Sequence, residues 1–140
     1  MADIAVTVAD VGVPDPGNAE IHQFVANAAN VTVGTWVYLL PTGKVALADA
    51  NGGTILFQAI GVVVSRRGNT VDVLKRGYVA GFTAPTNAPG TVAFLSDTVG
   101  MAADAASATK AVPLGRWLAA TDGVLTPILY VDIVYGALIA

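Results

Sequence analysis

The stretch GTWVYLLPTGKVALADA, which begins at Gly34, recurs 56 residues later as GTVAFLSDTVGMAADAA, which begins at Gly90. In both copies a Gly-Thr start leads into an apolar run, and a turn closed by glycine leads into a second run rich in alanine. With one inserted residue at Val99, identical residues stand at Gly34/Gly90, Thr35/Thr91, Leu39/Leu95, Thr42/Thr98, Gly43/Gly100 and Ala46/Ala103, among others. A turn of this kind between two apolar runs is typical of a β-hairpin, so the sequence predicts one hairpin in two copies.

Similar short apolar runs cover most of the remaining sequence. Val, Ile, Thr, Tyr and Phe are grouped in runs of about four to eight residues, as expected for strands. The predicted strands are VTVGTWVYLL, KVALA, FQAIGVVVS, TVDVLKRGYVAGF, GTVAFLS, AVPLGRWLA and PILYVDIVY, with turns at PTG, NGG, RRGN and APTNAPG. The alanine-rich GMAADAASATKAV has no apolar stripe at helical spacing and is interpreted as a loop. We therefore expect an all-β fold, a small antiparallel β-barrel or sandwich.

Each hairpin is followed by strands in the same order. An apolar strand containing a glycine comes next, around Gly61 in the first copy and Gly115 in the second, and a further strand follows it. The repeat-like units span about residues 31–83 and 87–135. Two interpretations remain open: a duplicated unit, or two hairpins that obey the same turn rules.

The first 24 residues differ from the rest of the chain. They carry four acids and no Lys or Arg, whereas residues 25–140 carry seven bases and six acids. VPDPGN, with two prolines and a glycine, resists both helix and central strand. We expect an extended acidic N-terminal arm, residues 1–24, followed by a β-barrel domain, residues 25–140. The arm either contacts a neighbouring subunit by strand addition or folds back on its own domain, and its candidate contact residues are Ile4, Val6, Val8 and Asp10.

Composition narrows the class of protein. The chain is 54% hydrophobic and only 12% charged, about half the usual charged fraction, which indicates apolar surface buried against other chains. We expect a homo-oligomer, with a trimer as the expected state; the alternative is a neutral surface of Ala, Gly and Thr. A net charge of −3 argues against nucleic acid as a partner. No apolar run reaches the roughly 18 residues of a membrane span, and the N-terminus lacks the features of a signal peptide.

Catalytic and cofactor signatures are missing from the sequence. The absence of cysteine and the single histidine, His22, exclude disulfides, thiolate metal sites and any site with two imidazoles. Glu20 and His22 fall on one face of a strand without a nucleophile nearby in sequence. Ser96 and Asp97 are better explained as turn caps, and the remaining acids are dispersed. We expect no enzyme activity, no cofactor and no metal.

Four of the seven basic residues lie within eleven residues of one another, at Arg66, Arg67, Lys75 and Arg76. If the two pairs end adjacent antiparallel strands, they form one basic patch at a sheet edge. That patch either protects the edge from aggregation or docks an acidic partner, such as the arm of a neighbouring copy.

The order of these motifs resembles that of a known family. The pattern A-x-x-V-T-x-G-T-x-V-Y-L…G-K-V-A-L-A-D-A…I-G-V…V-D-V…G-Y-V…P-G-T-V-A-F-L-S-D-T-x-G…P-L-G, over roughly Ala26 to Asp132, is similar to the capsid decoration, or cement, proteins of tailed bacteriophages. The resemblance implies a β-barrel or β-tulip that is made in the host cytoplasm, binds the major capsid protein on the outside of the virion and forms trimers or dimers. The family supplies no catalytic residues.

Two other functions stay open at this point. The same β module could serve another part of the virion, such as a tail, a fibre or a head tip. A carbohydrate-binding module would instead use Trp36, Tyr38 or Trp117 as a stacking platform. Against the second alternative, the repeat places Val92 and Phe94 at the positions of Trp36 and Tyr38, which indicates packing in a core.

Overall fold

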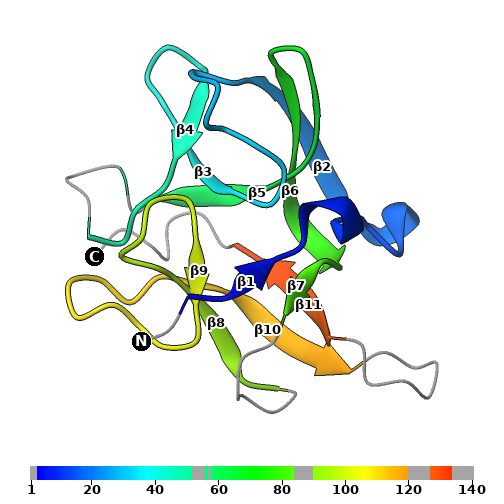
Figure 1. Ribbon diagram of the computed structural model, residues 1–140, viewed down its shortest axis with the longest axis vertical. Coiled ribbons are helices and arrows are strands. Elements are labelled where there is room, and N and C mark those ends of the chain that lie inside the picture. Colours follow the sequence, from blue (N-terminus) through cyan, green and yellow to red (C-terminus); the bar gives the residue numbers. More distant parts are fainter. Residues whose placement is uncertain (1–2, 52–55, 57, 84–89, 120–126, 134–140) are drawn as a thin grey trace.

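The computed structural model describes residues 3–51, 56, 58–83, 90–119 and 127–133 and is all-β and antiparallel, which confirms the predicted fold class (Figure 1). The strands are β1 (Ala5–Val6), β2 (Glu20–Val25), β3 (Trp36–Leu39), β4 (Val45–Leu47), β5 (Ala59–Arg67), β6 (Thr70–Val79), β7 (Phe82–Thr83), β8 (Val92–Leu95), β9 (Ala102–Ala103), β10 (Pro113–Ala119) and β11 (Pro127–Asp132). Two short 3-10 turns, η1 (Val8–Asp10) and η2 (Pro16–Asn18), precede β2. The predicted turns at NGG and APTNAPG lie largely outside the described residues.

Eight strands form a strongly curled half-barrel in the order β4-β3-β5-β6-β11-β10-β8-β9. This order reads alike from both ends, because each half consists of a hairpin, a return strand and a closing strand. The two closing strands, β6 and β11, pair with each other and join the halves. Strand β2 also pairs with β6, and β1 forms a separate two-stranded sheet with β7.

The two halves share their registers as well as their strand order. In each half, the return strand has one extra residue opposite the first hairpin strand, which is a β-bulge. The bulge lies at equivalent positions in the two halves. The equivalent registers are Val37↔Gly61 followed by Tyr38↔Ala59, and Ala93↔Gly115 followed by Phe94↔Pro113. The correspondence thus extends beyond the hairpins to the return strands, as a repeated unit requires and as shared turn rules alone do not.

A glycine is needed at the bulge of each return strand. A Cβ at Gly61 would collide with the carbonyl oxygen of Leu74 on β6, and one at Gly115 with the carbonyl oxygen of Tyr130 on β11. The closing strand passes too near for any side chain, which is a common reason for a glycine inside a strand. The glycine noted in each unit of the sequence therefore has the same structural cause.

Two apolar cores flank the sheet. The main core lies within the curl, and its largest fully buried side chains are Trp36, Trp117, Ile4, Leu74, Leu95, Leu114, Leu129 and Ile133. The smaller core lies on the other face of the first half and consists of Ala26, Val31, Val37, Val45, Val63, Val71 and Val73. The first half is therefore buried on both faces.

The second half presents one face to the main core. Its Ala93, Trp117 and Leu129 belong to that core, while Arg116 is exposed and Val92 and Tyr130 are only partly buried. The same sequence unit is thus used in two environments.

Candidate interaction surfaces

The N-terminal arm folds back on its own domain, one of the two alternatives for it. Ile4 is only 1% exposed and lies in the main core, and its amide donates to the carbonyl of Ala102 on β9 (2.8 Å). Val6 pairs with Phe82 and packs against the same core. Strand β2 crosses the boundary expected at residue 24. These residues are consequently part of the β domain, and Ile4 offers no surface to a neighbour.

The other two arm candidates do face solvent. Val8, in η1, is 58% exposed, and Asp10 at the end of the same turn is also exposed. The turn is closed by the amide of Val11, which donates to the carbonyl of Val8 (3.2 Å). Of the four predicted arm contacts, Val8 and Asp10 are thus available to a partner.

The prediction of one basic patch is wrong. Arg66 and Arg67 lie at the turn between β5 and β6, but Lys75 and Arg76 lie inside β6 rather than at its end. Arg66 is opposite Val71, and Lys75 lies four residues farther along β6, roughly 13 Å away at about 3.3 Å per residue. The ten-residue length of β6 separates the two pairs, and the spacing in sequence could not reveal it.

Arg66 has a structural role. Its Nη1 donates to the carbonyls of Val31 (2.6 Å) and Ala28 (3.2 Å), and its Nε donates to the carbonyl of Gly68 (2.8 Å). The side chain holds the loop before β3 against the β5–β6 turn. Arg67 is exposed and lies 3.5 Å from the carboxylate of Asp72.

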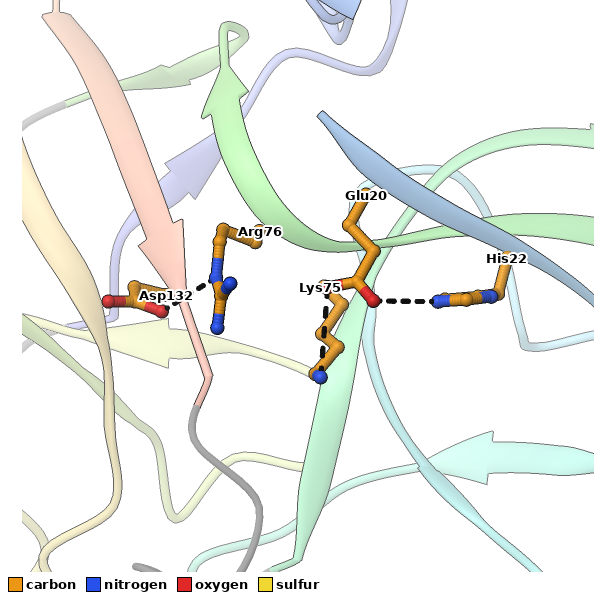
Figure 2. A network of polar contacts seen from close by, with 5 residues as sticks. All are labelled: Glu20, His22, Lys75, Arg76 and Asp132. Atoms are coloured by element: carbon orange, nitrogen blue, oxygen red, sulfur yellow. Dashed lines mark hydrogen bonds and ion pairs between the residues drawn. The ribbon is translucent and has the colours of Figure 1, made fainter. Parts of the chain in front are cut away.

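Lys75 and Arg76 take part in a charged network where β2 and β11 meet along β6 (Figure 2). Lys75 Nζ lies 3.7 Å from Glu20 Oε2, and Arg76 Nε lies 3.2 Å from Asp132 Oδ1. Glu20 belongs to the arm, so an acid of the arm does meet a predicted basic residue, within one chain. This network fixes the N-terminal end of β2 to the sheet.

Glu20 and His22 lie on one face of β2, as the sequence predicts. His22 Nε2 is 3.2 Å from Glu20 Oε1. The hydrogen bond with His22 is the main cause that lowers the pKa of Glu20; burial opposes it, and the charges of Lys75, His22 and Arg76 lower the pKa further. The pair is exposed at the sheet edge.

The hydroxyl groups of the buried serines Ser96 and Ser107 bond to carboxylates and cap turns. Ser96 Oγ donates to Asp3 and accepts from the amide of Thr98 (2.9 Å), which confirms its role in the turn. Ser107 makes the same kind of contacts with Asp97 and the amide of Thr109. Among the described residues, three or more His, Asp or Glu side chains nowhere gather in a group that could hold a metal ion.

The three aromatic residues of the carbohydrate-binding alternative are buried. Trp36 and Trp117 lie in the main core, where Trp36 packs against Phe82 with ring centroids 5.9 Å apart. Tyr38 is 8% exposed in the same core. A stacking platform must face solvent, so that alternative loses the residues on which it was based.

The outer face of the second half holds features that the sequence analysis missed. A hollow of about 320 Å³ is lined by Val92, Pro113, Gly115, Arg116, Tyr130 and Asp132. Tyr130 packs against Tyr78 of β6 with ring centroids 5.1 Å apart, and Arg116 Nη1 donates to the carbonyl of Gly90 (2.9 Å). The alternation of PILYVDI could have placed Tyr130 outside, but only the pairing of β11 with β6 brings the two tyrosines together.

Strand β2 was missed as an edge strand. It pairs with β6, and its Ile21 and Val25 are 39% and 46% exposed. A groove of about 360 Å³ beside it is lined by Gln23, Phe24, Val25, Gly43 and Thr70. The sequence signal was weak, because EIHQFV lacks a strict apolar and polar alternation and the boundary expected at residue 24 divided it.

Within the described residues, no helix has the length and apolar character needed to cross a membrane. Comparison with protein-family models, with curated proteins and with solved structures finds no match to this chain.

Proposed function

We propose that this chain is a structural protein of a tailed bacteriophage that binds the outer surface of the capsid and stabilises it. The observation that carries the proposal is the doubled unit: two like halves, locked together by the pairing of β6 with β11, make one stiff scaffold. The resemblance to decoration proteins covers Ala26 to Asp132, which is this doubled region. Such a protein performs no chemistry and acts as a clamp.

The use of the polar side chains supports a scaffold rather than an enzyme. Ser96, Ser107 and Ser65 bond to carboxylates of their own chain, and Arg66 holds a loop. Exposed apolar side chains remain for partners at Val8, Leu39, Val99 and Leu118. The partners are the major capsid protein and further copies of the chain, on the outside of the virion after synthesis in the host cytoplasm. Many weak contacts to a repeating shell would add up to firm attachment.

Binding to shells tests this function. Capsid shells of the encoding phage, prepared without this protein, are mixed with purified chain and sedimented. We expect the chain to sediment with the shells to saturation and to raise the temperature at which the shells break open. A chain that stays in the supernatant, or that binds without any effect on shell breakage, would contradict the proposal.

Val8 provides a matched variant for the same experiment. Val8→Asp places a charge on an exposed arm residue that makes no core contact, so folding should be unaffected while attachment through the arm is weakened. Ala9→Asp, in the same exposed turn, is the control for added charge. Equal loss of binding in both variants would mean that charge alone, and not the apolar contact of Val8, is responsible.

A further inference from the structure

Among the described residues, no strand pairs with the outer edge of β2 at Ile21 and Gln23; farther along the chain, Ala26 and Asn27 meet Val45 of β4. The amide of Ala26 donates to the carbonyl of Asn69 (2.8 Å), in line with the register Val25↔Thr70 of the β2–β6 pair. Hydrogen-bonded and non-hydrogen-bonded pairs alternate along an antiparallel ladder. Phe24 and His22 therefore direct their backbone groups toward β6, and Gln23 and Ile21 direct theirs outward.

The pairing on the other edge of β6, with β5, leads to the same assignment of inward and outward backbone groups on β2. Val63 on β5 is opposite Val73, and its amide and carbonyl are used by Thr35 and Gly34 on the far side of β5. Val73 consequently bonds to β2, opposite His22, which leaves the adjacent residues of β2 facing outward. Two independent sets of contacts thus agree on which groups are free.

In the part of the chain that the structure describes, the usual protection of an edge strand is missing at residues 21–23 of β2. Natural edges carry Lys, Pro or a covering segment, which prevent unwanted pairing. The six residues EIHQFV contain neither Lys nor Pro, and Ile21, His22, Gln23 and Val25 are exposed. The other outer strands are covered within the described residues: Ala26 and Asn27 contact β4, and Asp3 and Ile4 contact β9.

We propose that the β2 edge pairs with the β2 edge of a second copy of this chain, antiparallel, across a two-fold axis at His22. When two identical strands pair in antiparallel orientation, a two-fold axis relates them. The axis passes either between two copies of the same residue or between two neighbouring residue pairs. A register centred on His22 places Ile21 opposite Gln23 of the other copy and uses all four outward backbone groups of these two residues, one N–H and one C=O on each. The two-fold then makes four hydrogen bonds, and the sheets of the two copies become continuous.

The side chains fit this register. Ile21 and Gln23 of the two copies share one face, where the exposed part of Ile21 is covered. On the other face Glu20 lies opposite Phe24 of the second copy, and each Glu20 keeps its own His22 and Lys75. No carboxylate therefore faces another carboxylate directly across the pair. The inference rests on the self-association in the proposed function, and it predicts a dimer, because a two-fold contact does not close a ring of three.

A single-cysteine cross-link tests the register. The chain has no cysteine, so His22→Cys introduces one thiol at the two-fold axis. Residues in a non-hydrogen-bonded pair have Cα atoms about 4.5 Å apart, within the range of a disulfide. We expect His22→Cys to form a covalent dimer under mild oxidation. The neighbouring control Gln23→Cys should stay at least tenfold less cross-linked, since its counterpart across the axis is Ile21.

The unmodified chain and a proline variant complete the test. Sedimentation should give the unmodified protein a mass of twice 14.2 kDa at micromolar concentration, and Gln23→Pro, which removes an outward amide, should be monomeric with unchanged circular dichroism. A monomeric unmodified chain, a trimer, or cross-linking of Gln23→Cys in preference to His22→Cys would overturn the proposal. The capsid function is tested separately, because shell binding by a monomer would leave it standing.

Discussion

Single residues explain why the two halves adopt the same shape. Gly61 and Gly115 stand where a closing strand passes at backbone distance, and the turn glycines Gly43 and Gly100 have φ of 86° and 75°. Those φ values favour glycine, because other residues pay strain there. The sequence repeat therefore preserves the positions where only glycine fits.

Substitution of the bulge glycines should be costly. Gly61→Ala or Gly115→Ala forces the neighbouring strand aside, and we expect each to lower the free energy of unfolding by about 1–3 kcal/mol or more. Gly12→Ala is the control: a Cβ there meets no atom within 4 Å, so its effect should be within about 0.5 kcal/mol. Urea unfolding followed by fluorescence measures all three. Equal stability of the three variants would remove the physical basis of the repeat.

At the turn glycine Gly43, a substitution should destabilise the fold through backbone strain alone, without the steric clash expected at Gly61 and Gly115. A Cβ at Gly43 meets no atom within 4 Å, so the cost of Gly43→Val comes from its φ alone, about 1–3 kcal/mol. Gly43→Asn should cost less, because Asn tolerates this region better. Thermal melting of the two variants distinguishes them, and a Val variant that melts with the parent would show that the turn can change its backbone.

Glu20 should make stability depend on pH. The bond with His22, together with Lys75 and Arg76, lowers the pKa of Glu20 in the folded chain below its ordinary value of 4.5. The stabilisation is therefore present above about pH 4.5 and is lost as the pH falls through the lowered folded value. We expect Glu20→Gln to be less stable than the parent near pH 6 and to converge with it near pH 3. A stability difference that stays constant over this range would exclude the contribution of Glu20.

At the scale of elements, the repeated hairpins were predictable and the register of distant strands was not. Alternation and turn residues located β3, β4, β5, β6, β8, β10 and β11, because these are local properties. Ile4 gave no local sign of where it would be buried, since several apolar surfaces could have taken it. The separation of Arg66 from Lys75 depends on the length of β6, which a charge count does not contain.

Arg66 should stabilise the β5–β6 turn far more than Arg67. Arg66→Ala removes donors to Ala28, Val31 and Gly68, and charge-assisted bonds of this kind are worth about 1.5–3 kcal/mol. Arg67→Ala loses one exposed ion pair, worth about 0–1 kcal/mol. Denaturant unfolding compares the two variants. If Arg67→Ala is as harmful as Arg66→Ala, the loop before β3 is held in another way.

At the scale of the whole molecule, the arm and the β domain are one folding unit. Ile4→Ala should lower stability by about 2–5 kcal/mol, because it opens a cavity in the main core. Val8→Ala, on the same arm but exposed, should change stability by less than about 0.5 kcal/mol. Similar melting temperatures for both variants would mean that the arm does not belong to the core.

The candidate sites were less accessible from the sequence than the fold was. Val8 and Asp10 could be named from the composition of the arm, and both are exposed, so their contact with a partner stays a prediction. The edge of β2 could not be named, because an edge strand is one with a neighbouring strand on one side only, and the sequence does not show which strands become neighbours. Partner surfaces of this kind depend on the order of the strands in the sheet. That order is set by contacts between residues far apart in the sequence, so local patterns do not predict it.

Electron cryo-microscopy of the intact phage particle tests the central claim, attachment to the outside of the capsid, most directly. The account predicts density for the curled two-part half-barrel at repeated positions on the outer surface of the shell, with β2 edges of adjacent copies side by side. Density for this chain confined to the tail or fibres, or its absence from purified particles, would contradict the account.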